Sequence, residues 1–452
     1  MAYASPAPVA LGKIHRDSGP SVSAQLDLFN VPPTETSFLG GDRWVTVQPT
    51  TDTRTSSQLQ LLLTASDELY TDLNSSYGVI ECKVVKADGT ALPDDVDNFD
   101  VYPVSNLSSA LFDWITTQIN GVDADHCADY GVTSYLRGLL DETEASKKGR
   151  LSGEGWVEDG ATARDEADAP ADDKKKRKQL IAGSRVMSLL TRFNLALDRQ
   201  ERLVPPGVEL RLSMHRGPSA MCLMSPDANA DYKVVITKLE WHVRRVSVNP
   251  AISRAHVARL VEGNEYSIQV NKHRTRAFTI PAGVSSHRVV VDPGDALPTR
   301  LVVALQPHDA HVGAYRLSPY KFAPNGLSSI EVAVDGVSVG PRLDVDFTAK
   351  RYAHAYAHTI TSLGHARSRH SNGVSYSSFG DNQTVFVWSL ATDLPNKDTG
   401  SYFHLKRKAA LSVTLGFATP PQQPLTLLAF DVREDLFRLD LERRLTSTSG
   451  AA

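Results

Sequence analysis

DYKVVITKLEWHVRRVSVNPAISRAHVARLVEG, the stretch from Asp231 to Gly263, decides the fold of this chain because it joins two halves with similar patterns. Apolar and polar residues alternate from Tyr232 to Ile236 and then, in the opposite register, from Leu239 to Val243, which predicts one long strand with a bulge. Pro250 ends this strand and suits the first turn of a helix, and Gly263 is a suitable C-terminal cap. The stretch therefore predicts a long strand that leads into one short helix.

Short strands and turn dipeptides occupy the chain on both sides of this stretch. Asp88-Gly89, Asn120-Gly121 and Asp335-Gly336 favour the positive φ angles of tight hairpin turns. Strands that follow one another without regular helices are typical of antiparallel sandwiches, jelly-roll or immunoglobulin-like, and not of βαβ folds. At 452 residues the chain exceeds what one hydrophobic core normally organises, so we expect two all-β domains.

The expected boundaries follow from these patterns and from changes in composition. They are a flexible N-terminal arm (1–23), a first sandwich (24–249), a linking helix (250–263), a second sandwich (264–445) and a flexible C-terminal tail (446–452). The linking helix places its apolar residues, from Ile252 to Leu260, roughly along one face. Within the first sandwich, the spacing from Tyr130 to Leu140 predicts one further helix.

Residues 141–178 differ from the rest of the chain. They contain eleven acidic and nine basic side chains with little apolar periodicity, which predicts a long exposed insertion between two strands. The run KKKRK, at Lys174–Lys178, is interpreted as a solvated flank. A nuclear localisation signal or a contact to an acidic partner are the alternatives.

Composition excludes several classes of protein. With 41% hydrophobic and 22% charged residues the chain is neither wholly disordered nor a membrane protein, and no apolar run is long enough to insert into a bilayer. The first residues lack the pattern of a secretory signal, so secretion is not expected. Three separated cysteines, Cys82, Cys127 and Cys222, predict buried inert thiols in a reducing compartment. With a net charge of -4 the chain has no excess of basic residues, so specific nucleic-acid binding is not expected.

Enzyme motifs are absent from the sequence. It contains no GxxxxGK[ST], no GxGxxG after a strand, no GxSxG and no HExxH. Four histidines between residues 354 and 370 are a candidate zinc or nickel site, but the segment is expected to be a loop or strand, where spacing four does not bring side chains together. The other histidine pair is weaker. The residues concerned are His354, His358, His365 and His370, and the loop pair His308 and His311.

Two further patterns have a structural and a functional interpretation. Acidic pairs invite a glycosidase interpretation, but neighbours in sequence are not opposed carboxylates, so exposed loop acids are favoured. Tryptophans in strand-like stretches are expected to pack in the core, with a sugar-stacking platform as the alternative. The residues are Asp94-Asp95 and Asp172-Asp173, and Trp44, Trp114, Trp241 and Trp388. No catalytic, cofactor-binding or metal-binding residue is predicted, and the chain is not expected to be an enzyme.

Several long segments resemble one known family. They resemble, in the same order, the double jelly-roll capsid proteins of Polinton-like viruses and adintoviruses, which belong to the adenovirus-like capsid lineage. The segments are AQLDLFNVPPTETSF (24–38), PPGVELRLSMHRGPSAMCLMS (205–225), the stretch from 231 to 260, RAFTIPAG (276–283) and LLAFDVREDLFRLDLERR (427–444). Residues 141–178 and 354–370 depart from the family pattern.

The resemblance implies two tandem jelly rolls with a short linking helix and long loop insertions. It implies a major capsid protein that self-assembles into pseudo-hexagonal homotrimers, which tile an icosahedral shell. The implied partners are neighbouring capsomers, penton or vertex proteins, minor capsid or cement proteins, and a host receptor at the outer loops. No cofactor and no membrane insertion are implied. The implied location is the virion capsid, assembled in the host cytoplasm or nucleus. The alternatives are a minor capsid or vertex protein and a soluble glycan-binding module.

Overall fold

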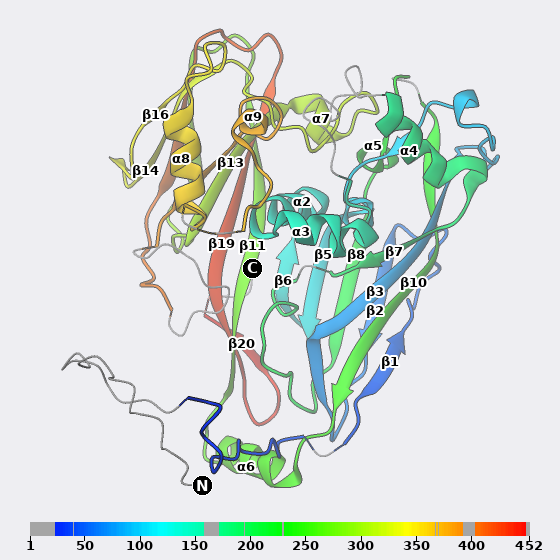
Figure 1. Ribbon diagram of the computed structural model, residues 1–452, viewed down its shortest axis with the longest axis vertical. Helices are drawn as coiled ribbons and strands as arrows, with labels where there is room; N and C mark the ends of the chain where they lie inside the picture. The colour runs from blue at the N-terminus through cyan, green and yellow to red at the C-terminus, as the bar shows by residue number, and fades with distance from the viewer. Residues whose placement is uncertain are drawn as a thin grey trace, which may run out of the picture.

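Two β-sandwiches stand side by side in the computed structural model of the chain (Figure 1). The structure describes residues 23–38, 40–157, 171–193, 195–227, 230–366, 368, 370–391 and 403–448. Most of the arm expected over residues 1–23 lies outside the described residues.

The first sandwich contains two four-stranded antiparallel sheets. One has the order β1-β10-β3-β7 and the other β2-β8-β5-β6, and the short strands β4 and β9 pair separately. The strands are β1 (Arg43–Val47), β2 (Gln58–Leu63), β3 (Tyr70–Lys86), β4 (Tyr102–Pro103), β5 (Phe112–Ile119), β6 (Val122–Cys127), β7 (Met187–Thr191), β8 (Leu210–Arg216), β9 (Leu223–Met224) and β10 (Tyr232–Val246).

The second sandwich repeats this arrangement. One sheet has the order β11-β19-β13-β17, with β20 added beside β19, and the other has the order β12-β18-β14-β15, with β16 added beside β14. The strands are β11 (Tyr266–Ile280), β12 (Ser286–Asp292), β13 (Arg300–Pro307), β14 (Leu327–Val334), β15 (Val337–Ser338), β16 (Leu343–Asp344), β17 (Val385–Ser389), β18 (Leu411–Phe417), β19 (Leu425–Leu439) and β20 (Leu445–Ser447).

Both sandwiches have the strand order of a jelly roll. If the main strands of each sandwich are numbered in chain order, both give one sheet with the order 1-8-3-6 and a second with the order 2-7-4-5. In each sandwich the chain passes back and forth between the two sheets, and this connection of eight strands is the double Greek key of a jelly roll. The all-β expectation of two tandem jelly rolls is confirmed.

The deciding stretch folds as its pattern predicts. β10 shifts register against β3 between Ile236 and Lys238, where the alternation changes face. The helix α6 (Pro250–Val261) follows, with the side chain of Asn249 accepting a hydrogen bond from the N–H of Ala251 at its N-terminus. Gly263 has φ +88° just beyond its C-terminus, a conformation that favours glycine.

Two hairpin turns also match their dipeptides. Asn120 and Gly121 have φ angles of 49° and 80° between β5 and β6, and Asp335 and Gly336 have 49° and 81° between β14 and β15. Positive φ at both central positions gives the turn whose twist suits paired strands, which is why these dipeptides select it.

Helices fill the connections between strands. They are α1 (Leu107–Ala110), α2 (Tyr130–Asp141), α3 (Glu144–Lys148), α4 (Ala171–Ile181), α5 (Ser219–Cys222), α7 (His308–Val312), α8 (Ala353–Ser362) and α9 (Tyr376–Phe379), with the 3-10 turns η1 (Val96–Asn98), η2 (Arg150–Glu154) and η3 (Ala182–Ser184). Figure 1 shows α2 and α3 between the two rolls and α6 at one end of the molecule. The helix predicted at 130–140 is confirmed as α2. No helix among the described residues is long and apolar enough to cross a bilayer.

The expectation of an exposed insertion over 141–178 is wrong for its described parts. Residues 141–157 and 171–178 are largely helical, and Lys147, Glu154 and Arg177 are buried. Arg177, within the basic run, donates to the carbonyl oxygen of Pro103 and lies 5.7 Å from the ring of Tyr102. Burial lowers the pKa of Arg177 to about 10. These charged side chains are ordered because tertiary partners replace water, which periodicity does not reveal.

The tail expected from residue 446 is also ordered up to residue 448. Leu445–Ser447 form β20, which pairs with the end of β19, and Thr448 hydrogen-bonds the carboxylate of Asp435.

Candidate functional site

Helix α2 belongs to the first roll but packs against the second. The ring of Tyr135 stacks on Tyr320 at 4.3 Å between centroids and on Trp156 at 4.8 Å. The hydroxyls of Thr133 and Thr275 lie 2.6 Å apart, which places the helix directly on β11. The helix is therefore a buried wedge between the two rolls.

Polar contacts continue this junction beyond the aromatic stack. The carboxylate of Asp141 lies 2.8 Å from the guanidinium of Arg300 on β13. The ammonium of Lys147 donates to the carbonyl oxygens of Leu139 in the first roll and Asn372 in the second. Because both ends of these contacts are largely buried, the junction fixes how the rolls are oriented.

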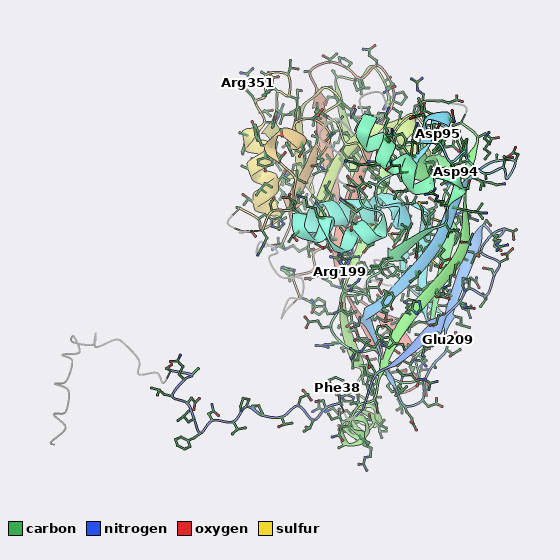
Figure 2. The ribbon with its side chains drawn as sticks, turned by 45° about the vertical axis from the view of Figure 1, so that its right-hand side comes forward. Phe38, Asp94, Asp95, Arg199, Glu209 and Arg351 are labelled. Atoms are coloured by element: carbon green, nitrogen blue, oxygen red, sulfur yellow. The ribbon has the colours of Figure 1, made fainter. Side chains whose placement is uncertain are left out.

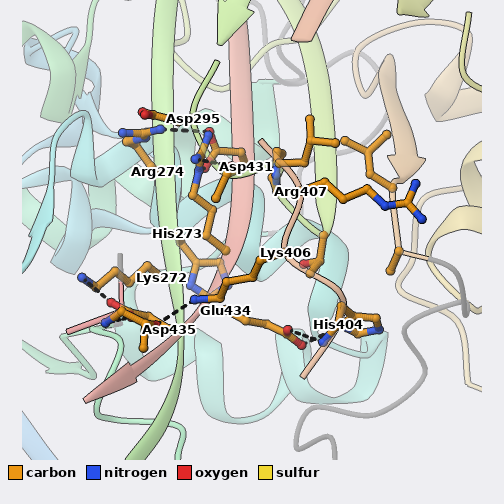
Figure 3. Close-up of a pocket in the computed structure, with 18 of the residues that line it drawn as sticks. Lys272, His273, Arg274, Asp295, His404, Lys406, Arg407, Asp431, Glu434 and Asp435 are labelled. Atoms are coloured by element: carbon orange, nitrogen blue, oxygen red, sulfur yellow. Dashed lines mark hydrogen bonds and ion pairs between the residues drawn. The ribbon is translucent and has the colours of Figure 1, made fainter. Parts of the chain in front are cut away.

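A cavity of about 560 Å³ opens beside the wedge, where β6 of the first roll approaches β11 and β19 of the second. Charged side chains dominate its wall (Figure 3). They are Asp125 and His126 from β6, Lys272, His273 and Arg274 from β11, Asp431, Arg433, Glu434 and Asp435 from β19, and Asp295, His404, Lys406, Arg407 and Lys408 from the connections.

Three arginines and two aspartates form a network on one side of the cavity. Asp431 accepts from Arg276 at 2.8 Å and from Arg433 at 3.0 Å, and Asp292 also accepts from Arg433. Arg274 lies farther away, at 3.7 Å from Asp431. Burial pushes the pKa of Asp292 upward, but its hydrogen bonds from Arg433 and from two backbone N–H groups outweigh burial and lower the pKa to about 2.

The opposite side of the cavity anchors the end of the described chain. Asp435 is fully buried, and its carboxylate lies 2.8 Å from the ammonium of Lys272 and accepts from the hydroxyls of Ser447 and Thr448. His404 Nδ1 lies 2.7 Å from a carboxylate oxygen of Glu434. These bonds tie β20 and the segment before β18 to β19.

His273 lies in the wall between the two sides. Its ring stacks on Phe430 at 5.7 Å. Burial lowers the pKa of His273 far below its usual value, and the nearby Arg137, Arg300 and Arg199 lower it further. The imidazole is therefore neutral at physiological pH.

The chemistry of this site is that of a structural clasp. Two of its carboxylates, those of Asp431 and Asp435, lie 2.8 Å from the cationic groups of Arg276 and Lys272, so these charges are paired within the chain. Among the described residues no group of three histidine, cysteine, aspartate or glutamate side chains has a geometry that would hold a metal ion.

Known proteins share this architecture over nearly the whole chain. No protein-family model matches the sequence. It is 21% identical over 424 residues to an uncharacterised protein of Caenorhabditis elegans, covering 91% of this chain and 98% of the relative.

Solved structures are similar to the chain in fold. A chain in the structure of the Sputnik virophage has a TM-score of 0.64 at 12% identity, over 96% of this chain and 94% of that chain. The mavirus major capsid protein has a TM-score of 0.53 at 12% identity, over 97% and 96%. The fold is the double jelly roll. The Faustovirus major capsid protein is similar too, with a TM-score of 0.53 at 8% identity, over 90% and 92%.

The histidines of residues 354–370 belong to α8 and to the connection that follows it in the second jelly roll. The expectation of a loop or strand is wrong for the first two, because α8 carries both His354 and His358 one turn apart. The ring of His358 packs edge-on against Trp388 at 5.6 Å. His365 and His370 follow in the connection after α8. In the other pair, His308 Nδ1 lies 3.0 Å from the hydroxyl of Thr426, and His311 lies 3.9 Å from Asp129.

The acidic pairs do not converge on a site in the double jelly roll. The side chain of Asp94 is 85% exposed, and Asp95 accepts a hydrogen bond from the N–H of Asp97 at the start of η1. Figure 2 labels both at the edge of the molecule. Asp172 and Asp173 are on α4, and their side chains lie outside the described residues.

The cysteines and two of the tryptophans are core residues, as predicted. Cys82, Cys127 and Cys222 are buried and unpaired with one another, and burial raises the pKa of each thiol to about 12. Trp241 and Trp388 are also buried.

Trp44 does not pack in the core. It is 45% exposed and lies 5.6 Å from Tyr77, which stacks on His242 at 5.1 Å across the sheet of β1, β10 and β3. Trp114 is partly buried and stacks on His215 at 5.4 Å. The prediction failed for Trp44 because an edge strand exposes one face to solvent, and alternation alone does not identify which face.

The junction and the cavity were not predicted from the sequence. Their residues come from positions more than a hundred apart, such as Thr133 with Thr275, and no motif spans such a distance. One signal was available: the charged residues Asp431, Arg433 and Asp435 interrupt the apolar run of the last long strand at alternate positions, which places them on one face.

Proposed function

We propose that this chain is a viral major capsid protein that assembles as a homotrimer. The observation that carries the proposal is the fusion of two jelly rolls of identical strand order into one body by a buried wedge. Likeness in fold to the mavirus and Faustovirus major capsid proteins, over 97% and 90% of the chain, supports it.

The proposed assembly follows from this duplication. Three chains contribute six sandwiches, which gives a capsomer a nearly hexagonal outline that tiles an icosahedral shell. A permanent shell of this kind requires interfaces of roughly 2,000–5,000 Å² with apolar centres and polar rims. We assign residues 24–249 and 264–445 to the two rolls and residues 250–263 to the link between them.

We further propose that the virus or element belongs to the Polinton-like and adintovirus group. The segments that resemble the capsid proteins of this group support that assignment. The proposed location is the virion capsid, after assembly in the host cytoplasm or nucleus. Penton, minor capsid and cement proteins would bind the capsomer edges, and a host receptor would bind the outer loops.

The proposed role is structural and not enzymatic. The largest concentration of titratable groups described above is the cavity between the rolls, where partners hold the carboxylates in place. Such a clasp supports a rigid building block.

Light scattering on the purified chain tests the proposal. A homotrimer has a mass of about 148 kDa, which is three times 49.3 kDa. Negative-stain micrographs of the expressed protein should show hexagonal particles or closed shells. A monomer at micromolar concentration, with no assembled particles, would rule the proposal out.

Two alternatives make different predictions. A vertex protein is usually a single sandwich, so the second roll argues against that role. The exposed aromatic pair of Trp44 and Tyr77 is the observation that favours a soluble glycan-binding module. That alternative predicts a monomer or dimer that binds a glycan array, with binding lost in Trp44→Ala.

A further inference from the structure

The segment before β1 exposes apolar side chains that the chain's own body does not cover. Ser23–Ser37, here called the arm, runs away from both rolls, and Figure 2 shows it leaving the molecule near Phe38. The exposed fractions of its apolar side chains are large: Leu26 70%, Leu28 75%, Phe29 95% and Val31 82%. Four large apolar side chains within six residues are a costly surface to leave in water.

The base of the arm is fixed beside helix α6. The N–H of Asn249 donates to the carbonyl oxygen of Ser37, and the Asn249 side chain donates to that of Thr36. Asn249 is also the residue that caps α6. Phe38 forms a bridge with Val248. The arm therefore begins at a defined point at the α6 end of the molecule.

Two prolines direct the arm away from its own helix. Pro32 and Pro33 favour an extended backbone of about 3.1 Å per residue, so the segment from Thr36 to Val31 spans roughly 15 Å. Ten residues separate Leu26 from Thr36, so a fully extended arm would reach at most about 30 Å from the anchored base. The hydrogen bonds of the arm beyond this base join residues two or three positions apart, such as Asn30 to Asp27 at 3.2 Å, and so do not fold it back.

Helix α6 offers an apolar face of matching character. Arg254, Val257, Ala258 and Val261 are spaced to lie on one side of the helix, and all four are exposed, with Val257 at 48% and Val261 at 68%. Of the residues that the sequence placed along the apolar face from Ile252 to Leu260, only Leu260 is buried.

Charge is complementary between the two segments. The arm contains Asp27 and Glu35 and no basic residue, whereas α6 contains Arg254, His256 and Arg259 and no acidic residue. Opposite charges at the rim of an apolar contact steer the partners and fix their register.

We propose that the arm of one copy of this chain docks on the α6 face of a neighbouring copy, with Leu26, Leu28, Phe29 and Val31 packing against Val257 and Val261. This inference rests on the proposed self-assembly and identifies one of its contacts. The contact is heterologous, since each copy gives an arm and receives one, so three copies close a ring at the α6 end of the capsomer.

Disulfide trapping between two differently tagged chains tests the contact. One chain carries Phe29→Cys and the other carries Val261→Cys, so a disulfide between the two positions can form only between chains. The native cysteines are buried, which keeps their reactivity low. After co-assembly and mild oxidation, we expect a reducible band of two chains that contains both tags.

The matched control replaces Val261→Cys with Val337→Cys. Val337 is 70% exposed, similar to Val261, but lies on the β14–β15 hairpin of the second roll. Substituting the arm as Leu28→Ser with Phe29→Ser should weaken association at least tenfold, whereas Gln25→Ala should leave it unchanged.

The outcomes separate this inference from the proposed function. Trimers that form normally but give no more 29–261 disulfide than the 29–337 control would overturn the arm contact and leave the capsid role intact. A chain that carries both cysteines and cross-links only within itself would also overturn it, as would an arm that instead binds vesicles of neutral lipid. Failure of every variant and the native chain to self-associate would overturn the proposed function itself.

Discussion

Gly138 is a position where the absence of a side chain is required. It lies within α2, and a Cβ there would be 2.9 Å from Cζ3 of the buried Trp156 ring, closer than such atoms approach. Alanine normally stabilises a helix interior by about 1 kcal/mol relative to glycine. Overpacking a filled core costs about 1–3 kcal/mol. The Trp156 ring is held between Tyr135 and Lys147 and cannot move away, so the clash outweighs the helix preference for alanine.

We therefore expect Gly138→Ala to lower the free energy of unfolding by up to about 2 kcal/mol in urea denaturation. Gly41→Ala is the control, because a Cβ at Gly41 has no heavy atom within 4 Å. Equal stability of the two variants would mean that the wedge is loosely packed.

His273 gives the stability of the protein a pH dependence. Its folded-state pKa is far below the ordinary value of about 6.5, so below pH 6.5 the unfolded chain binds a proton that the folded chain does not. Above pH 6.5 His273 does not change the free energy of unfolding. Below pH 6.5 it lowers the free energy of unfolding, by at most about 1.4 kcal/mol per pH unit for one proton.

As the pH falls from 7 to 5, we expect the free energy of unfolding to decrease less in the His273→Gln variant than in the native chain. Comparing slopes removes the opposite contributions of other buried groups, such as Glu154, whose pKa burial raises to about 7. His370→Gln, at an exposed position, should keep the native slope. Parallel slopes for all three proteins would contradict a neutral His273.

At the scale of elements, β20 depends on a single buried carboxylate. Asp435 accepts hydrogen bonds from Ser447, from the N–H and hydroxyl of Thr448 and from Lys272. Asp435→Asn removes the negative charge beside a mostly buried ammonium, which costs about 3 kcal/mol in comparable pairs.

We expect Asp435→Asn to release β20, so that the backbone after Arg443 and Arg444 becomes mobile enough for trypsin to cleave it. Limited proteolysis followed by mass spectrometry measures the release. Asp344→Asn is the control, since Asp344 is a 73% exposed partner of Arg342 and should not change the digestion pattern. Unchanged cleavage in Asp435→Asn would show that the β19 pairing alone holds the strand.

Elements differ in how far the sequence predicts them. Strands with alternating burial, such as β2, and the Asn120-Gly121 and Asp335-Gly336 turns were predicted because local backbone preference and burial agree there. α8 was missed because its alanine, histidine and threonine residues give only a weak apolar stripe. Order in α3 and α4 was missed because buried partners for Lys147 and Arg177 come from distant segments.

At the scale of the whole molecule, the two rolls share one core. A continuous cluster of buried side chains runs through both, and Tyr135 of α2 contacts Tyr320 and Phe322 of the second roll. We expect the rolls to unfold together, so that urea transitions followed by tryptophan fluorescence and by circular dichroism coincide.

Tyr135→Ala should uncouple the rolls as well as destabilise them. Loss of a buried aromatic side chain costs about 3–5 kcal/mol, and here the lost contacts cross the junction. We expect the two transitions to separate. Tyr376→Ala removes a stack with Tyr352 inside the second roll and should keep a single transition. Separate transitions in the native chain would contradict a shared core.

The sequence predicted the number and kind of the rolls but not how they meet. Strand patterns report which face of each sheet is buried, and the segments that resemble known capsid proteins added the tandem arrangement. The contact between Arg274 and Asp431 depends on the register between β11 and β19, which places these two residues, 157 positions apart in the sequence, directly opposite each other. Such register is a tertiary property.

The two rolls have the same strand order but carry different helices. α2 and α3 belong to the connections of the first roll, and α8 belongs to a connection of the second. A hexagon built from three such pairs has alternating corners, so turning it by 60° gives a different tile. In the proposed shell, two neighbouring capsomers would therefore either share one orientation or differ by a turn of 60°, and the edges that they present to each other would differ between these two cases.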